Sequence, residues 1–241
     1  MSFSAPFRAT IAVYGDDALA QSLDFPIARS VDDRYDFLLI ATGERLELRD
    51  QRNAKLKPLS IDFTTLNAAG LSRRQPLARA IGKAESIVDA TAGLAQDTLR
   101  LALMGYRVTA IERHAAVAAL VQDGLRRFLS DHDLADRVRL LRGDARLLLP
   151  TLPPPEVVYL DPMFPPKRRA SAAVRKELQW LRDLVGEDHD ADALLDAALS
   201  VATYRVVVKR PDHAPPLRSN PAVSIAGKLV RYDVYSTRLK K

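Results

Sequence analysis

The segment best suited to chemistry is a short strand that ends in an acid and several prolines. Residues 157–160 (Val-Val-Tyr-Leu) are typical of a buried strand. Proline cannot donate a ladder hydrogen bond and biases the residue before it away from helix, so this strand must end near Asp161. An acid, free carbonyls and an aromatic ring are therefore predicted at the carboxyl edge of a sheet, where open α/β sheets bind ligands. The residues after the strand are Asp161-Pro162-Met163-Phe164-Pro165-Pro166.

These groups suit the binding of a flat base that carries an amine. Asp161 and the carbonyl of Pro162 could accept hydrogen bonds from the amine, and Phe164 could stack on the face of the base. We therefore identify Asp161, Pro162 and Phe164 as candidate catalytic residues. The alternative is a proline-rich loop that follows a core strand and has no catalytic role.

Two further predicted strands end in residues that suit a nucleotide. After the strand at 86–89, Asp89 is followed by small residues up to Gly93, which would let a ligand approach the backbone closely. Glu112 ends the strand at 107–112, 19 positions after Gly93. That separation suits an acid that accepts hydrogen bonds from both hydroxyls of a ribose.

A third strand, at 138–142, leads into Asp144 and Ala145, where an acid or a backbone amide could meet the edge of an adenine. Each of these features has an ordinary explanation by itself, as a helix cap, a surface acid or a turn. Their order at successive strand ends favours a nucleotide site.

The acids in the first turn indicate which nucleotide binds. A dinucleotide site needs G-x-G-x-x-G so that the backbone can receive a pyrophosphate, but only Gly93 is present here. Asp89 and Asp97 would repel a pyrophosphate and would suit a ligand with a cationic end. S-adenosylmethionine has a sulfonium and an ammonium group and no phosphate, so the sequence favours it over NAD.

The elements that must position these residues alternate as strand and helix from about residue 80. Such alternation predicts a doubly wound α/β sheet, mostly parallel, with helices on both faces. We expect an antiparallel closing pair near the C-terminus. Residues 1–75 are predicted to form a small α+β region, with a hairpin turn at 42–44, and residues 76–241 the main domain. Strands are expected at 10–14, 37–41, 45–48, 86–89, 107–112, 138–142, 157–161, 204–208, 222–225 and 231–236, and helices at 97–104, 117–128, 174–185 and 194–199.

Composition excludes several classes of function. The chain has no cysteine and its four histidines lack ligand spacing, so we expect no metal site. The longest apolar run, 115–121, is too short to span a bilayer, and the N-terminus does not resemble a signal peptide, so we expect a cytoplasmic protein. Residues 1–44 carry a net charge of −4 and residues 45–83 a net charge of +6. This asymmetry favours a nucleic-acid partner, although an unevenly charged solvated surface would look the same.

Basic residues also follow the predicted site. Phosphate contacts supply affinity and register rather than sequence recognition, and basic side chains near the pocket are candidates for them. For Arg175 and Lys176 a solvated helix face is the alternative. The candidates are Lys167, Arg168, Arg169, Arg175, Lys176, Lys209 and Arg210.

A specific combination of motifs occurs in four segments, residues 89–94, 112–113, 157–165 and 206–212. Together these segments resemble the RsmJ family of bacterial ribosomal RNA methyltransferases, and the resemblance covers roughly residues 60–235. It implies a class I methyltransferase fold, S-adenosylmethionine as cofactor, and methylation of the exocyclic amine of one guanine in 16S ribosomal RNA, either free or in the small subunit. The cofactor contacts that it implies are Gln96, Asp97, Glu112, Arg113, Asp144, Ala145 and Asp161.

The chain departs from the family pattern at two places. Ala95-Gln96-Asp97 stands where Gly-Arg-Asp is expected, which removes a cation that could hold the carboxylate of the cofactor. The segment 70–76 is shorter and poorer in glycine than expected. Two alternatives remain open: methylation of another planar amine or amide, such as DNA adenine or protein glutamine, and an RNA-binding relative without catalysis.

Overall fold

The computed structural model describes residues 9–66, 70–130, 133–163, 184–185 and 190–237. These residues pack as two compact units. The larger unit includes residues 62–163 and 190–237, and the smaller includes residues 9–61. Residues 62–66 and 70–75 pack with the larger unit, and the division of the sequence at residue 75 stays a prediction.

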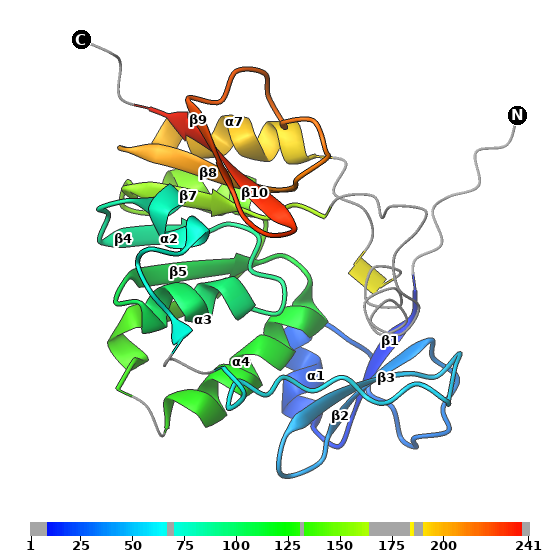
Figure 1. Cartoon of the computed structure of the whole chain (residues 1–241). Coiled ribbons are helices and arrows are strands. Elements are labelled where there is room, and N and C mark those ends of the chain that lie inside the picture. The colour runs from blue at the N-terminus through cyan, green and yellow to red at the C-terminus, as the bar shows by residue number, and fades with distance from the viewer. Residues whose placement is uncertain (1–8, 67–69, 131–132, 164–183, 186–189, 238–241) are drawn as a thin grey trace, which may run out of the picture. The chain divides into compact units, whose positions relative to one another are not determined.

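The larger unit is built on a seven-stranded sheet with the strand order β6-β5-β4-β7-β8-β10-β9 (Figure 1). Strands β6, β5, β4, β7 and β8 are parallel, and β10 runs antiparallel between β8 and β9. A mostly parallel sheet with an antiparallel closing strand is therefore confirmed. The strands are β4 (Ser86–Asp89), β5 (Arg107–Glu112), β6 (Val138–Arg142), β7 (Val157–Leu160), β8 (Arg205–Pro211), β9 (Val223–Ala226) and β10 (Val230–Ser236).

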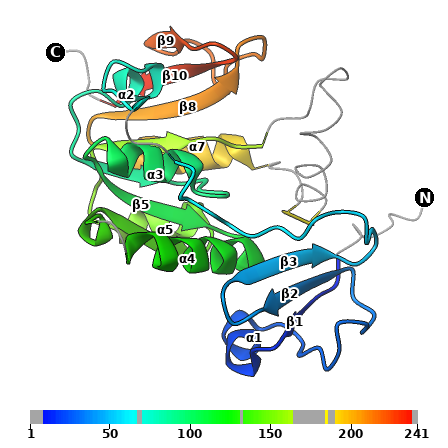
Figure 2. The same ribbon diagram turned by 60° about the horizontal axis from the view of Figure 1, so that its bottom comes forward.

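Helices cover both faces of this sheet. Figures 1 and 2 show α3 and α4 on one face and α7 on the other. Helix α3 ends as predicted at a glycine, Gly105, whose φ of +96° would strain any other residue. The helices are α2 (Pro76–Ile81), α3 (Gln96–Leu103), α4 (Ala115–Leu129), α5 (Ala145–Leu148) and α7 (Ala191–Val201), and 3-10 turns lie at Ala135–Arg137 and Leu149–Thr151.

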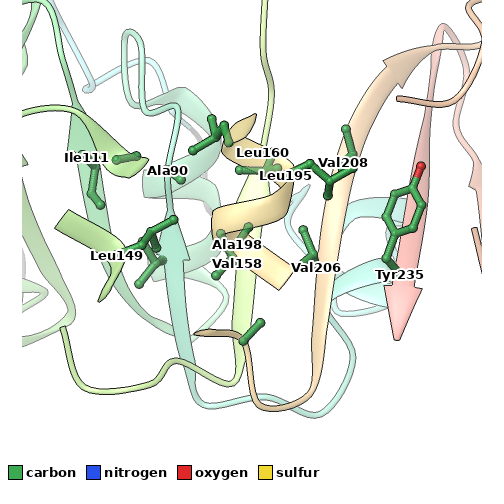
Figure 3. Packing of buried hydrophobic residues seen from close by; sticks show 14 residues of the cluster. Ala90, Ile111, Leu149, Val158, Leu160, Leu195, Ala198, Val206, Val208 and Tyr235 are labelled. Carbon is green, nitrogen blue, oxygen red and sulfur yellow. The ribbon is translucent and has the colours of Figure 1, made fainter. Parts of the chain in front are cut away.

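Apolar side chains from β7 and β8 form the core beneath α7 (Figure 3). Alternate residues of a strand point to the same face, so Val158 and Leu160 lie together, as do Val206 and Val208. Leu195 of α7 packs into this cluster and is fully buried. This packing holds the strand that leads into Asp161 rigidly in place.

The smaller unit contains a three-stranded sheet. β1 (Ile11–Tyr14) pairs parallel with β2 (Phe37–Ala41), which forms the predicted hairpin with β3 (Leu46–Asp50). Helix α1 (Asp17–Leu23) was not predicted, although Asp16 caps it by accepting a hydrogen bond from the Leu19 amide at 2.8 Å.

All ten predicted strands are confirmed, most within one or two residues of their observed ends. The helices α2 and α5 were missed because both are short. α2 nevertheless carries a start signal, a proline at its first position. The helix predicted at 174–185 lies largely outside the described residues.

Leu195→Ala should destabilise the larger unit. Removing a fully buried leucine side chain leaves a cavity and should lower the free energy of unfolding by about 2–5 kcal/mol, as measured by urea denaturation. Leu229→Ala is the matched control, because Leu229 is 76% exposed and its loss should change stability by less than about 0.5 kcal/mol. Equal effects of the two substitutions would contradict this account of the core.

Candidate active site

The predicted site residues converge at the carboxyl edge of the parallel strands. Asp89, the last residue of β4, lies opposite Ala110 of β5 and Tyr159 of β7. Glu112 lies two positions after Ala110, and Asp161 lies two positions after Tyr159. The parallel register therefore brings all three acids to one edge of the sheet. This is the edge at which open α/β sheets bind ligands.

The turn between β4 and α3 is compact and built from small residues. Gly93 and Ala95 both have positive φ, +51° and +56°, which is the left-handed region. A glycine adopts this conformation freely, whereas at Ala95 it costs free energy and must be stabilised by the surrounding structure. Gln96 follows as the exposed first residue of α3. The turn therefore exposes backbone to which a ligand can come close.

Glu112 connects this turn to the end of β5. Its Oε2 accepts a hydrogen bond from the Gly93 amide at 2.9 Å, and its Oε1 accepts one from the His114 amide at 2.7 Å. The side chain is buried and lies at the end of its strand. Glu112 therefore holds the first turn in position, and its carboxylate stands at the place where the sequence predicts a ribose.

Asp89 is the most buried acid of the site, with only 1% of its surface exposed. It accepts hydrogen bonds from the hydroxyl of Thr98 at 2.6 Å and from the amide of Thr91 at 3.3 Å. Burial raises the pKa of Asp89 to about 7, more than these hydrogen bonds lower it. The negative charges of Asp97 and Asp161 raise its pKa further.

Asp97 and Asp161 share one lysine. The Nζ of Lys209 lies 2.8 Å from a carboxylate oxygen of each acid. Asp97 also accepts hydrogen bonds from the Tyr159 hydroxyl at 2.7 Å and from Arg100 at 2.8 Å. Burial raises the pKa of Asp97, but the Lys209 charge and the donated hydrogen bonds lower it below its ordinary value overall.

Asp161 is the most accessible acid of this cluster. Its side chain is 40% exposed, compared with 11% for Asp97. Its backbone amide donates to the hydroxyl of Thr91 at 2.6 Å, which ties the end of β7 to the turn after β4. Pro162 follows and is buried, whereas Phe164 lies outside the described residues.

The remaining predicted cofactor contacts belong to a second charged cluster. Asp144 caps α5 and pairs with Arg146, and Ala145 is the buried first residue of that helix. Arg146 and Arg113 both pair with Asp190, at 3.2 and 3.1 Å. Hydrogen bonds from Arg146 lower the pKa of Asp144 more than burial raises it. This cluster joins the ends of β5 and β6 to the start of α7.

Two residues that were predicted to contact phosphate form bonds with other groups of the protein. Lys209 bridges the two acids described above, and Arg210 is buried and donates to the carbonyl of Pro215 at 2.9 Å. These positions favour roles inside the protein, and phosphate binding by either residue stays a prediction. The other candidates, Lys167, Arg168, Arg169, Arg175 and Lys176, lie outside the described residues.

Sequence reasoning missed several residues of the site. Thr91, Thr98 and Tyr159 form hydrogen bonds with Asp89, Asp97 and Asp161. A threonine in a turn or a helix, or a tyrosine in a strand, carries no distinctive signal in the sequence. Asp190 and Arg146 were also missed. Arg146 had a recognisable position two residues after Asp144, whereas Asp190 is far away in the sequence.

The residues present fit the cofactor that the sequence predicts. Asp97 and Asp161 form an acidic cluster beside a turn of small residues, which suits a cationic ligand without phosphate. No group of three or more possible metal ligands occurs among the residues that the structure describes. In the same ranges, no helix is long and apolar enough to cross a membrane.

Known proteins share the sequence pattern and the fold of this chain. A family model described as "Putative SAM-dependent methyltransferase" matches residues 19–237. A crystal structure of a SAM-dependent methyltransferase from Neisseria gonorrhoeae superposes with a TM-score of 0.69, at 31% sequence identity, over 94% of this chain and 96% of that chain. The chain is therefore an S-adenosylmethionine-dependent methyltransferase.

Two curated relatives narrow the assignment, and both are named ribosomal RNA small subunit methyltransferase J. The one from Aeromonas salmonicida is 48% identical over 83% of this chain and 86% of the relative. The one from Thioalkalivibrio sulfidiphilus is 44% identical over 92% of both. The chain belongs to the ribosomal RNA small subunit methyltransferase J family, which confirms the resemblance seen in the sequence.

Asp89→Asn should change how stability depends on pH. The raised pKa means that folded Asp89 holds its proton up to about pH 7, whereas the unfolded chain releases it near pH 4. Asp89 therefore makes wild-type stability fall between about pH 4 and pH 7, by roughly 4 kcal/mol at most. Urea denaturation across this range should show a smaller fall for Asp89→Asn. Parallel curves for the two proteins would contradict the raised pKa.

Proposed function

We propose that this chain transfers a methyl group from S-adenosylmethionine to the exocyclic N2 amine of a guanine in 16S ribosomal RNA. The observation that carries the proposal is the partly exposed Asp161 carboxylate, which lies next to a buried acidic cluster at the ligand-binding edge of the sheet. The names of the curated relatives support small-subunit ribosomal RNA as the substrate. Such a substrate would place the enzyme in the cytoplasm.

Residues of the first turn and the strand ends would hold the cofactor. Glu112 would accept hydrogen bonds from the ribose, and Asp144 or the Ala145 amide would meet the adenine. Asp97 would face the cationic end, with Asp89 behind it. Gly93 and Gln96 would line the approach. Arg113 would act through Asp190, with which it pairs.

For methyl transfer, the protein mainly has to align the guanine amine with the methyl group and stabilise the positive charge that develops on the amine. Bound S-adenosylmethionine supplies an activated methyl group on a sulfonium. The guanine amine is a poor nucleophile because its lone pair is delocalised into the ring. Asp161 and the carbonyl of Pro162 accept hydrogen bonds from this amine and so favour a tetrahedral nitrogen. The carboxylate of Asp161 stabilises the positive charge that develops there, and the nitrogen loses one proton either to Asp161 or to water.

The enzyme can bind the target guanine only when this base is no longer stacked on its neighbours in the RNA. An enzyme that modifies a base inside a folded RNA must bind it unpaired or flipped out. Phe164 is our candidate for stacking on the exposed base, an interaction worth about 1–3 kcal/mol in single-stranded sites.

The alternatives differ in substrate or in activity. Loops of the Asp-Pro-x-aromatic kind also suit DNA adenine and protein glutamine, but the relatives' names favour RNA. A non-catalytic RNA-binding relative would have no need for a partly exposed acid beside the cofactor cluster.

Asp161→Asn should slow methyl transfer much more than it weakens cofactor binding. Replacing the carboxylate removes the charge that stabilises the reacting amine, so we expect kcat to fall about 100-fold or more, with a change in S-adenosylmethionine affinity below about fivefold. The assay incubates the protein with unmodified 16S ribosomal RNA and detects N2-methylguanosine by mass spectrometry after digestion.

The exposed Asp136 provides the control for this experiment. Asp136→Asn should leave both quantities unchanged. If Asp161→Asn turned over at the wild-type rate, Asp161 would have no part in the chemistry. Methylated adenine or protein in place of N2-methylguanosine would reassign the substrate.

Replacing Lys167, Arg168 and Arg169 together with alanine should weaken RNA binding in a salt-dependent way. Each lost phosphate contact should flatten the slope of log affinity against log salt by about 0.7 for a single strand. Filter binding at several salt concentrations measures this slope. An unaltered slope would exclude these three residues from phosphate binding.

A further inference from the structure

Lys209 lies where two different functions of the site meet. Lys209 is on β8, opposite Tyr232 of β10, and only 23% of its side chain is exposed. The ammonium group reaches the carboxylates of both Asp97 and Asp161 at 2.8 Å. Under the proposed function, Asp97 faces the cofactor and Asp161 faces the base. One cation therefore joins the cofactor side of the site to the substrate side.

The ion pairs of Lys209 with Asp97 and Asp161, here called the bridge, also reduce the repulsion between negative charges in the site. Burial is the main cause of the raised pKa of Asp89, and the negative charges of Asp97 and Asp161 raise that pKa further. Burial lowers the pKa of Lys209, but its two acidic partners outweigh this and raise it above its ordinary value. Lys209 is therefore ionised throughout the neutral range, and it offsets part of the repulsion between the acids.

The geometry gives Asp161 a defined orientation. The Asp161 side chain is 40% exposed, and a charged partner restrains the rotation of such a carboxylate about its side-chain bonds. The Lys209 ammonium binds its Oδ2, and the Thr91 hydroxyl accepts from its backbone amide. Both contacts come from the same sheet edge, so the Lys209 ammonium fixes the position of one carboxylate oxygen of Asp161.

We propose that Lys209 is a positioning residue for methyl transfer: it orients the Asp161 carboxylate toward the reacting amine and couples it to Asp97 on the cofactor side. This inference rests on the proposed function. It differs from a phosphate contact, which would act on RNA affinity and leave the reaction rate on bound RNA unchanged.

Lys209→Met tests the bridge, because methionine keeps much of the side-chain volume and removes the charge. We expect kcat to fall about tenfold or more, with the KM for RNA changed less than about threefold. Loss of a cation within 4 Å should raise the pKa of both acids, so the acidic limb of the pH–rate profile should move up by about one unit or more. The charged and titratable groups that interact with Lys209 are Asp97, Asp161 and Tyr232. Asp89, Tyr159 and Arg100 interact in turn with these acids.

Two further variants separate positioning from mere stability. Lys209→Arg keeps the charge. It should therefore retain the acidic limb of the wild-type pH–rate profile, even if the longer, forked arginine side chain lowers kcat. Lys228→Met is the matched control, since Lys228 is exposed on the turn between β9 and β10. It should behave as wild type. Circular dichroism and urea denaturation of each variant establish that the comparison is made between folded proteins.

A measurement without RNA keeps this inference separate from the proposed function. Carbon-13 NMR of the aspartate carboxyl groups, with Asp161→Asn used for assignment, reports the titration of Asp161 in wild type and Lys209→Met. An upward shift of about one pH unit or more supports the bridge even if no RNA were methylated, which would overturn only the proposed function. An unchanged titration would overturn the bridge. A higher KM for RNA with unchanged kcat would instead make Lys209 a phosphate contact.

Discussion

The parallel pairing of β4 with β5 on one side and β7 on the other is the constraint on which the site depends. Parallel strands bring their carboxyl ends to a common edge, and the register sets Asp89 opposite Ala110 and Tyr159. From that register it follows that Glu112 and Asp161 reach the same edge. A slip of one residue would turn every side chain of a strand to the other face of the sheet and dismantle the site.

Bringing several carboxylates to one edge creates a repulsion that the protein must offset. It does so in two ways. Asp89 is buried deeply enough to hold a proton into the neutral range, and Asp97 and Asp161 share the ammonium of Lys209. The cluster keeps negative charge at its accessible side, where Asp161 lies. Under the proposed function, the cationic end of the cofactor would approach these carboxylates.

Much of the architecture could be predicted because it depends on local patterns. The strand before Asp161 stops where proline removes a hydrogen-bond donor, and α3 stops at a glycine with positive φ. The helices α2 and α5 were not predicted because their six and four residues are too few to show the helical repeat of apolar positions. The order of the acids along the chain, each at the end of a strand, was enough to predict a cofactor site.

The sequence by itself determined the alternation of strand and helix, the acids at the strand ends, and the family to which the chain belongs. Each of these is a property of neighbouring residues or of fixed spacings. Only the tertiary structure decided the partner of each charge. Lys209 and Asp161 are 48 positions apart, and Lys209 and Asp97 are 112 apart. A basic residue after a strand suggests a phosphate contact, and its true neighbours emerge only once β8 pairs with β7, because long-range pairing chooses which charges meet.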